Sequence, residues 1–142
     1  MQSAHYPPRG RRGYSRSTRS HRYGLRLDTD SSPILLAQIE TIEGVANAGA
    51  IAAVDGIDVL FVGPAALIFD LPARPDRAET DYDGCLKKVA AAASENGKQC
   101  GILLRSEADE KKLREMGFTV LAMDSDMGIL RMQYQAILRR KD

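Results

Sequence analysis

Two apolar runs in this chain end in residues that could do chemistry. The run at 34–37 is followed by Gln38 and Glu40, and the run at 59–62 is followed by Gly63 and Pro64. Uninterrupted apolar runs are typical of buried strands in parallel α/β folds, whose active sites form at the carboxyl ends of the strands. A glutamate there is costly to bury unless a cation or hydrogen bonds hold it. Glu40 is therefore the leading candidate for a functional residue.

The elements that must position Glu40 follow a regular alternation of strand and helix after Pro33. Four βα units in a row predict a parallel sheet covered on both faces by helices. Four units make half of a (β/α)8 barrel or a small open doubly wound sheet, and the pattern alone does not separate the two. The predicted strands are 34–39, 59–62, 100–104 and 118–123, and the predicted helices are 41–54, 81–96, 106–116 and 126 onward.

Two details of this pattern are specific enough to test. The segment 68–80 contains Pro72 and Pro75, which predicts an irregular connection rather than a helix. The last helix carries an apolar stripe at helical spacing, which predicts that this stripe is buried. The stripe consists of Leu130, Tyr134, Ile137 and Leu138.

The first thirty residues form a separate region, an irregular arm before a βα domain at 31–142. Seven arginines and no acidic residue precede Asp28, and prolines and glycines interrupt any periodicity. Three interpretations compete: a basic arm that binds nucleic acid through phosphates, an organelle transit peptide, and an irregular loop of a larger fold. We favour the loop, and we expect nucleic acid not to be a partner.

The composition excludes several other classes. The chain has 142 residues with a net charge of +1, which suits one globular domain. Cys85 and Cys100 have no metal-binding spacing, which favours reduced thiols in a cytoplasmic protein. No apolar run is long enough for a membrane span, and there is no apolar segment near Met1 that would direct secretion. No dinucleotide-binding or P-loop motif follows a strand.

Five short motifs together resemble the HpcH/HpaI aldolase family, also called the 2,4-dihydroxyhept-2-ene-1,7-dioate aldolase or citrate-lyase-like family. They occur in the family's order and at similar spacing, and they cover nearly all of the chain but only the second half of the family's sequence. The resemblance implies half of a (β/α)8 barrel, and it makes the arginine-rich arm an internal loop. The motifs are YPPRGRRG at 6–13, RYG at 22–24, QIET at 38–41, AIAAVDGIDVLFVGPA at 50–65 and GKQCGIL at 97–103.

The resemblance also implies a class II pyruvate aldolase, a carbon–carbon lyase that acts on a pyruvate-like 2-oxo acid and an aldehyde. In this family Mg²⁺ or Mn²⁺ stabilises the enolate as a Lewis acid. Carried over by position, Glu40 is a metal ligand and Gln38 lines the pocket beside the 2-oxo acid. The backbone N–H of Ala65 meets the substrate carboxylate, and Leu103 provides an apolar wall.

Two departures from the family pattern affect this expectation. The family's second metal ligand is an aspartate in GPADL, where this chain has Ala66, so we expect metal binding to be weakened or lost. Asp70 could replace it only if the loop were rearranged. The family's catalytic histidine and substrate-binding arginine come from the first half of the barrel. The alternative function is therefore an inactive half-barrel subunit that associates with itself or with a complementary first-half chain.

Overall fold

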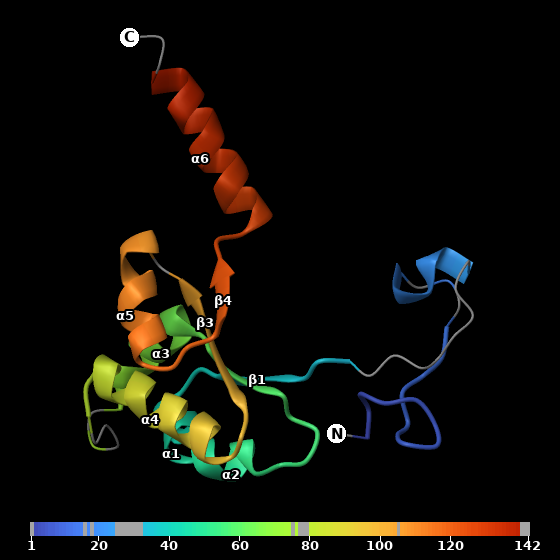
Figure 1. Cartoon of the computed structure of the whole chain (residues 1–142). Coiled ribbons are helices and arrows are strands. Elements are labelled where there is room, and N and C mark those ends of the chain that lie inside the picture. The colour runs from blue at the N-terminus through green and yellow to red at the C-terminus, as the bar shows by residue number, and fades with distance from the viewer. Residues whose placement is uncertain are drawn as a thin grey trace.

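The computed structural model describes residues 2–15, 17, 19–24, 33–74, 76, 80–104 and 106–139. Strands and helices alternate along the chain, and four strands lie side by side (Figure 1). The strands are β1 (Leu36–Ile39), β2 (Val59–Val62), β3 (Gln99–Leu104) and β4 (Val120–Met123). The helices are η1 (Arg19–Gly24), α1 (Ile42–Ala46), α2 (Ala48–Ala52), α3 (Pro64–Ala73), α4 (Tyr82–Glu95), η3 (Glu107–Asp109), α5 (Glu110–Glu115) and α6 (Asp126–Arg139).

The four strands form one parallel sheet in the order β1-β2-β3-β4. Each strand therefore pairs with the next strand in sequence, with no reversal of order. A doubly wound sheet reverses its strand order at a switch point, whereas a (β/α)8 barrel adds its strands in sequence. The observed order is that of half a barrel, and it confirms the predicted parallel βα units.

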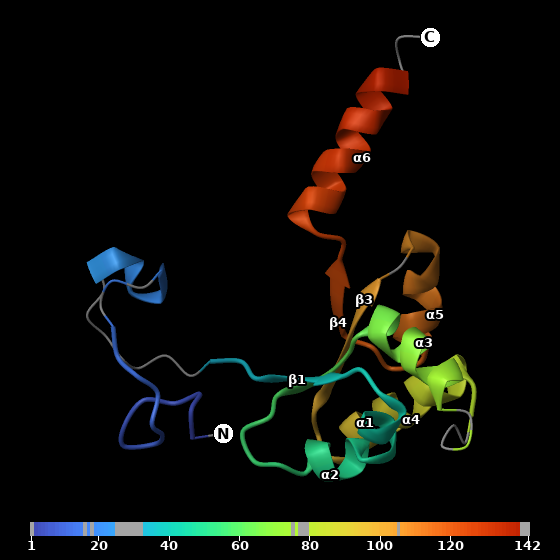
Figure 2. The ribbon, with the colours of Figure 1, turned by 180° about the vertical axis from the view of Figure 1, so that it is seen from behind.

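The helices that pack on the sheet cover only one of its faces, so the prediction that both faces are covered is wrong. On the covered face, Ile39, Leu60 and Ile102 are at most 2% exposed. The opposite face carries Leu36, which is 47% exposed, and Leu103, which is 38% exposed. Figures 1 and 2 show α1, α2, α4 and α5 together on one side. The open face is the one that lines the interior of a closed barrel.

The core lies between the covered face and the helices. Small side chains allow close packing here, because Ala48, Ala52 and Ala93 are almost fully buried where α2 and α4 approach each other. Phe118, which precedes β4, is 1% exposed and belongs to the same cluster. The packing explains why a chain with few large aromatic residues still forms one continuous core.

Two predicted helix boundaries change in the structure. The predicted helix at 41–54 is two short helices, because the backbone at Asn47 leaves the helical region with φ −93° and ψ 6°. The predicted irregular segment is partly wrong, because α3 runs from Pro64 through Pro72 to Ala73. Pro72 lies in the last turn, where its missing N–H removes only one helical hydrogen bond. The rest of that segment includes 75 and 77–79, which lie outside the described residues.

Helix α6 does not have the buried stripe that the sequence predicts. It projects away from the sheet in both views (Figures 1 and 2). All four residues of the stripe are at least half exposed: Leu130 at 50%, Tyr134 at 61%, Ile137 at 52% and Leu138 at 64%. The periodicity predicted an apolar face correctly, but none of the described residues buries it.

Where it is described, the arm has no regular element apart from η1. Residues 6–14 are held together by their own contacts. The rings of Tyr6 and Tyr14 meet edge to face at 5.8 Å, and the Arg12 guanidinium lies 5.0 Å from the centre of the Tyr6 ring. No helix in the described part of the chain is long and apolar enough to cross a membrane.

Candidate functional site

The strand register brings two of the predicted site positions, Glu40 and Leu103, into one row with Gly63. The last residues of β1 and β2, Ile39 and Val62, are paired, and Val62 is paired in turn with Ile102. The next residue on each strand continues this register, which places Glu40, Gly63 and Leu103 at one level of the carboxyl edge. Glu40 and Leu103 are separated by two strand spacings, roughly 10 Å. The row lies on the edge where α/β enzymes bind their ligands.

Glu40 packs directly against the turn that follows β2. A Cβ atom added to Gly63 would lie 2.8 Å from Cγ of Glu40 and 2.9 Å from its Oε1. The absence of a side chain at Gly63 therefore makes room for the carboxylate. The Gln38 amide donates a hydrogen bond to Oε1 of Glu40 at 3.3 Å. Both side chains are exposed on the open face, so they are accessible to a ligand.

Helix α3 begins at this turn. Gly63 is its N-cap, Pro64 occupies the first position, and Leu67 donates the first helical hydrogen bond to the Gly63 carbonyl at 3.0 Å. The N–H groups of Ala65 and Ala66 precede that bond and have no acceptor within the helix. The positive end of the α3 dipole adds to their preference for an anion. Ala66 is exposed and carries no group that could bind a cation.

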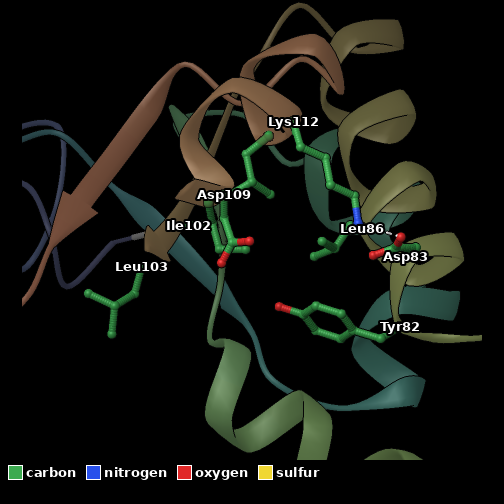
Figure 3. Close-up of a pocket in the computed structure, with 8 residues that line it drawn as sticks. Tyr82, Asp83, Leu86, Ile102, Leu103, Asp109 and Lys112 are labelled. Carbon is green, nitrogen blue, oxygen red and sulfur yellow. Dashed lines mark hydrogen bonds and ion pairs between the residues drawn. The ribbon is translucent and has the colours of Figure 1, made fainter. Parts of the chain in front are cut away.

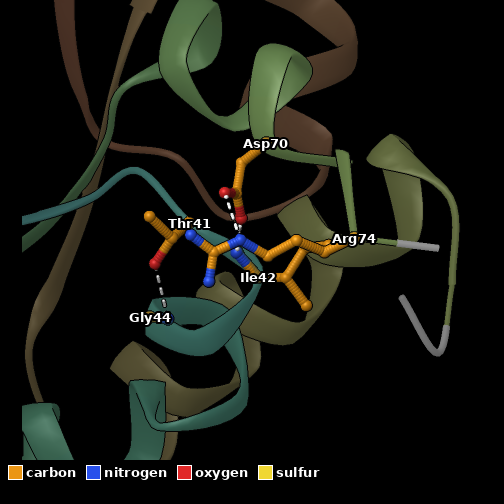
Figure 4. A network of polar contacts seen from close by, with 5 residues as sticks. All are labelled: Thr41, Ile42, Gly44, Asp70 and Arg74. Carbon is orange, nitrogen blue, oxygen red and sulfur yellow. Dashed lines mark hydrogen bonds and ion pairs between the residues drawn. The ribbon is translucent and has the colours of Figure 1, made fainter. Parts of the chain in front are cut away.

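Asp70 is not available as a substitute ligand. Its Oδ2 accepts a hydrogen bond from the backbone N–H of Ile42 at 2.8 Å, and its Oδ1 pairs with Nε of Arg74 at 3.0 Å (Figure 4). Its side chain is only 12% exposed. Both oxygens thus serve structural contacts. Within the described part of the chain, no group of three or more His, Cys, Asp or Glu residues could hold a metal ion.

The capping role of Asp70 was not foreseen from the sequence. The spacing of Asp70 and Arg74 is a local signal for an ion pair on a helix. The contact with Ile42, 28 residues away, depends on how α3 packs against α1. Thr41, by contrast, caps α1 locally, because its Oγ1 accepts from the Gly44 N–H at 3.0 Å.

Leu103 lines two cavities near the carboxyl ends of β3 and β4. The smaller, about 220 Å³, lies between α4 and α5, where Lys112 donates to Asp83 at 2.6 Å (Figure 3). That hydrogen bond raises the pKa of Lys112. The larger, about 560 Å³, is lined by residues that include Ser106, Asp124 and Ser125. Neither of these two cavities is lined by Gln38, Glu40 or Ala65.

The two cysteines are buried and are not nucleophiles in this structure. Cys85 is 2% exposed and Cys100 is 3% exposed, and neither forms a disulfide. Burial raises the pKa of the Cys100 thiol to about 12 and raises that of Cys85 as well. Both thiols therefore stay protonated at neutral pH, which agrees with a packing role.

Comparison with known proteins places these features in one family. The profile of the HpcH/HpaI aldolase/citrate lyase family matches residues 2–132. The 5-keto-4-deoxy-D-glucarate aldolase of Citrobacter koseri is 37% identical over 139 residues, which are 95% of this chain and 54% of the relative. The chain thus spans about half the length of the curated relatives that it matches.

Solved structures give the same result. An HpcH/HpaI aldolase/citrate lyase family protein from Burkholderia cenocepacia matches 99% of this chain and 58% of its own, with 29% identity and a TM-score of 0.78. An HpcH/HpaI aldolase from Desulfitobacterium hafniense matches 98% of this chain and 56% of its own, with 26% identity and a TM-score of 0.73. Profile, sequence and fold agree, and the chain belongs to the HpcH/HpaI aldolase/citrate lyase family.

Proposed function

We propose that this chain supplies the carboxyl-edge site of a carbon–carbon lyase that acts on a pyruvate-like 2-oxo acid and an aldehyde. Membership of an aldolase family and the similarity to a 5-keto-4-deoxy-D-glucarate aldolase support this reaction class. The observation that carries the proposal is the contact of Glu40 with Gly63, beside the unpaired N–H groups at the start of α3. This contact places the Glu40 carboxylate next to the N-terminus of α3, which can bind an anion, at the carboxyl edge of the sheet where catalysis is expected.

Each residue has a definite part in the proposed site. The carboxylate of the 2-oxo acid binds at the Ala65 N–H, where the α3 dipole favours negative charge. Gln38 lies on the open face and orients Glu40 through its amide. Leu103 forms the apolar side of the site. In a closed barrel, the space between these groups would be shielded from water, which strengthens such polar contacts.

The metal site is the part of the family's chemistry for which this chain lacks one of the expected ligands. Mg²⁺ or Mn²⁺ prefers several oxygen ligands, and two carboxylates from the protein suit it. Here Glu40 is one carboxylate, Ala66 supplies none, and both oxygens of Asp70 are engaged. We therefore propose that divalent metal binding is weakened or lost in this chain and that lyase activity is impaired accordingly.

Restoring the missing carboxylate tests both statements. Mn²⁺ affinity is measured by electron paramagnetic resonance for the unaltered chain, for Ala66→Asp and for Ala66→Asp combined with Glu40→Gln. We expect the single variant to bind at least tenfold more tightly than the unaltered chain and the double variant to lose that gain, because charged ligands dominate the site. Equal, weak binding by all three folded chains would refute the assignment of Glu40.

Activity is tested with the same variants by proton exchange at the methyl group of pyruvate in deuterated buffer with Mn²⁺. We expect the slowest exchange from the unaltered chain and faster exchange from Ala66→Asp. If Ala66→Asp binds Mn²⁺ but exchanges no protons, the residues of this half are insufficient for enolisation. The proposed impairment would then have a second cause besides Ala66.

A second candidate function is that of an inactive half-barrel subunit. Two observations on the described residues favour it: the sheet has an open apolar face with an unpaired edge at β1 and another at β4, and α6 exposes its apolar stripe. Unpaired edges and apolar patches of this kind favour association. We expect self-association, or binding to a complementary first-half chain, in sedimentation experiments. A monodisperse monomer that binds no such chain would contradict this function, and Ile137→Asp would weaken association if α6 contributes to it.

A further inference from the structure

Asp70 is the only buried charged or polar residue among those that the structure describes. A buried carboxylate is costly unless hydrogen bonds or charges compensate for it. Asp70 meets this requirement with the Ile42 N–H on one oxygen and the Arg74 guanidinium on the other. The contacts to its two oxygens differ in kind, because Arg74 is the C-cap of the same helix whereas Ile42 begins a different one (Figure 4).

The contact with Ile42 joins the two segments that carry the proposed site. Ile42 begins α1, two residues after Glu40, and Asp70 lies on α3, whose first turn contains Ala65. The hydrogen bond therefore fastens the turn after β1 to the helix after β2. Thr41 also caps α1, but its hydrogen bond with the Gly44 N–H stays within that helix and does not connect α1 to α3.

The Glu40 side chain lies in close contact with Gly63, at the start of α3. Its Cγ and Oε1 lie less than 3 Å from where a Cβ of Gly63 would be. A small shift of the Glu40 turn therefore changes the position of its carboxylate relative to α3. Functional groups must be held to within roughly 0.5 Å for binding or catalysis. The residues that hold them usually do not touch the ligand and act through hydrogen bonds to the functional residue or its backbone.

We infer that Asp70 is a positioning residue, which holds the Glu40 turn against α3 through the Ile42 N–H. Only one consequence of this inference, the effect on binding of a 2-oxo acid, rests on the proposed function. The Glu40 position itself is measurable without any ligand. Asp70 does not touch the substrate in this arrangement and acts through the backbone of the turn.

The ligand-free measurement is the nuclear Overhauser effect between the Glu40 side chain and the α-protons of Gly63. We expect it in the unaltered chain, and we expect Asp70→Ala to lose it. Asp70→Asn should retain it, because the amide oxygen can still accept from the Ile42 N–H. Arg74→Ala should also retain it, since only the ion pair between Asp70 and the C-cap of α3 is removed. If the effect persists in Asp70→Ala, the inference is wrong.

The second measurement is the dissociation constant of pyruvate, followed by the amide shifts of Ala65 and Ala66. We expect Asp70→Ala to raise it roughly tenfold, as loss of a supporting residue commonly does. Asp70→Asn should stay within about threefold of the unaltered chain. Thr41→Ala is the matched control, because it also weakens the start of α1. An equal loss of affinity in Thr41→Ala would show that helix capping in general, and not the tether to α3, is responsible.

The two measurements separate failure of the inference from failure of the proposed function. If pyruvate shifts no amide in the unaltered chain, the proposed site does not bind a 2-oxo acid, and the Overhauser effect still decides whether Asp70 positions Glu40. If pyruvate binds equally to the unaltered chain and to a folded Asp70→Ala variant, the proposed site stands and Asp70 is not its positioning residue.

Discussion

Two glycines at neighbouring strands test how rigidly the sheet and the site are packed. Gly63→Ala introduces a Cβ atom 2.8 Å from Cγ of Glu40. Gly101→Ala introduces one 2.6 Å from Cδ2 of Phe61 and 3.0 Å from the carbonyl oxygen of Val120. Both contacts are too close to persist, so a neighbour must move in each variant. The two positions differ in what that neighbour is.

At Gly63 the neighbour is an exposed, flexible side chain. Glu40 can rotate away at little cost, and the backbone of Gly63 (φ −91°, ψ 94°) is acceptable for alanine. Replacing glycine at such a position restricts the unfolded chain and stabilises a protein by about 0.4–1 kcal/mol. We therefore expect the free energy of unfolding to change by less than about 1 kcal/mol in either direction. The Glu40 carboxylate, however, should be displaced.

At Gly101 one neighbour is backbone. The Val120 carbonyl belongs to the β3–β4 pair, so it cannot retreat without opening the sheet. Overpacking of this kind costs about 1–3 kcal/mol. For a chain of this length, 1 kcal/mol corresponds to a shift in Tm of about 3–4 °C. Gly101→Ala should therefore melt several degrees below both the unaltered chain and Gly63→Ala.

The assay is urea unfolding followed by circular dichroism, with thermal melting as a second measure. The m value should be the same for all three chains, so that midpoints report stability. Equal destabilisation by Gly63→Ala and Gly101→Ala would refute the reasoning, because it would mean that Glu40 is held as firmly as the sheet backbone. Gly63→Ala should also weaken pyruvate binding, while Gly101→Ala leaves the Glu40 contact in place.

Two further predictions concern the core. Phe118→Ala should destabilise the chain by about 3–5 kcal/mol in urea unfolding, because a fully buried aromatic ring is lost; a loss below about 1 kcal/mol would contradict its burial. Cys100 predicts a pH dependence: below pH 9 its thiol is protonated in both states, but between about 9 and 12 only the unfolded chain releases the proton, so stability falls as pH rises. One such group contributes about 1.4 kcal/mol per pH unit at most. The stability advantage of the unaltered chain over Cys100→Ala should therefore shrink by about 1 kcal/mol between pH 8 and pH 10, and an unchanged advantage would contradict the raised pKa.

The sequence by itself determined the repeating units and the position of the carboxylate. Apolar runs, helix caps and glycine stops are local signals, and they placed β2 at Val59–Val62 and α4 after Asp81. The same signals placed Glu40 at the end of a strand. The family resemblance added the roles of Gln38, Ala65 and Leu103, which remain predictions, as does the effect of Ala66 on metal binding.

Only the tertiary structure decided how these units face one another. The apolar stripe of α6 and the apolar runs of the strands predicted burial, but burial requires a second surface, and the described part of the chain covers only one face of the sheet. The prolines predicted an irregular segment, but α3 continues through Pro72, because this residue lies in the last turn of the helix. Asp70 reaches Ile42 across 28 residues, and a hydrogen bond between segments that far apart depends on packing rather than on local propensity. Sequence periodicity determines which side of an element is apolar, whereas the packed fold determines whether anything covers it.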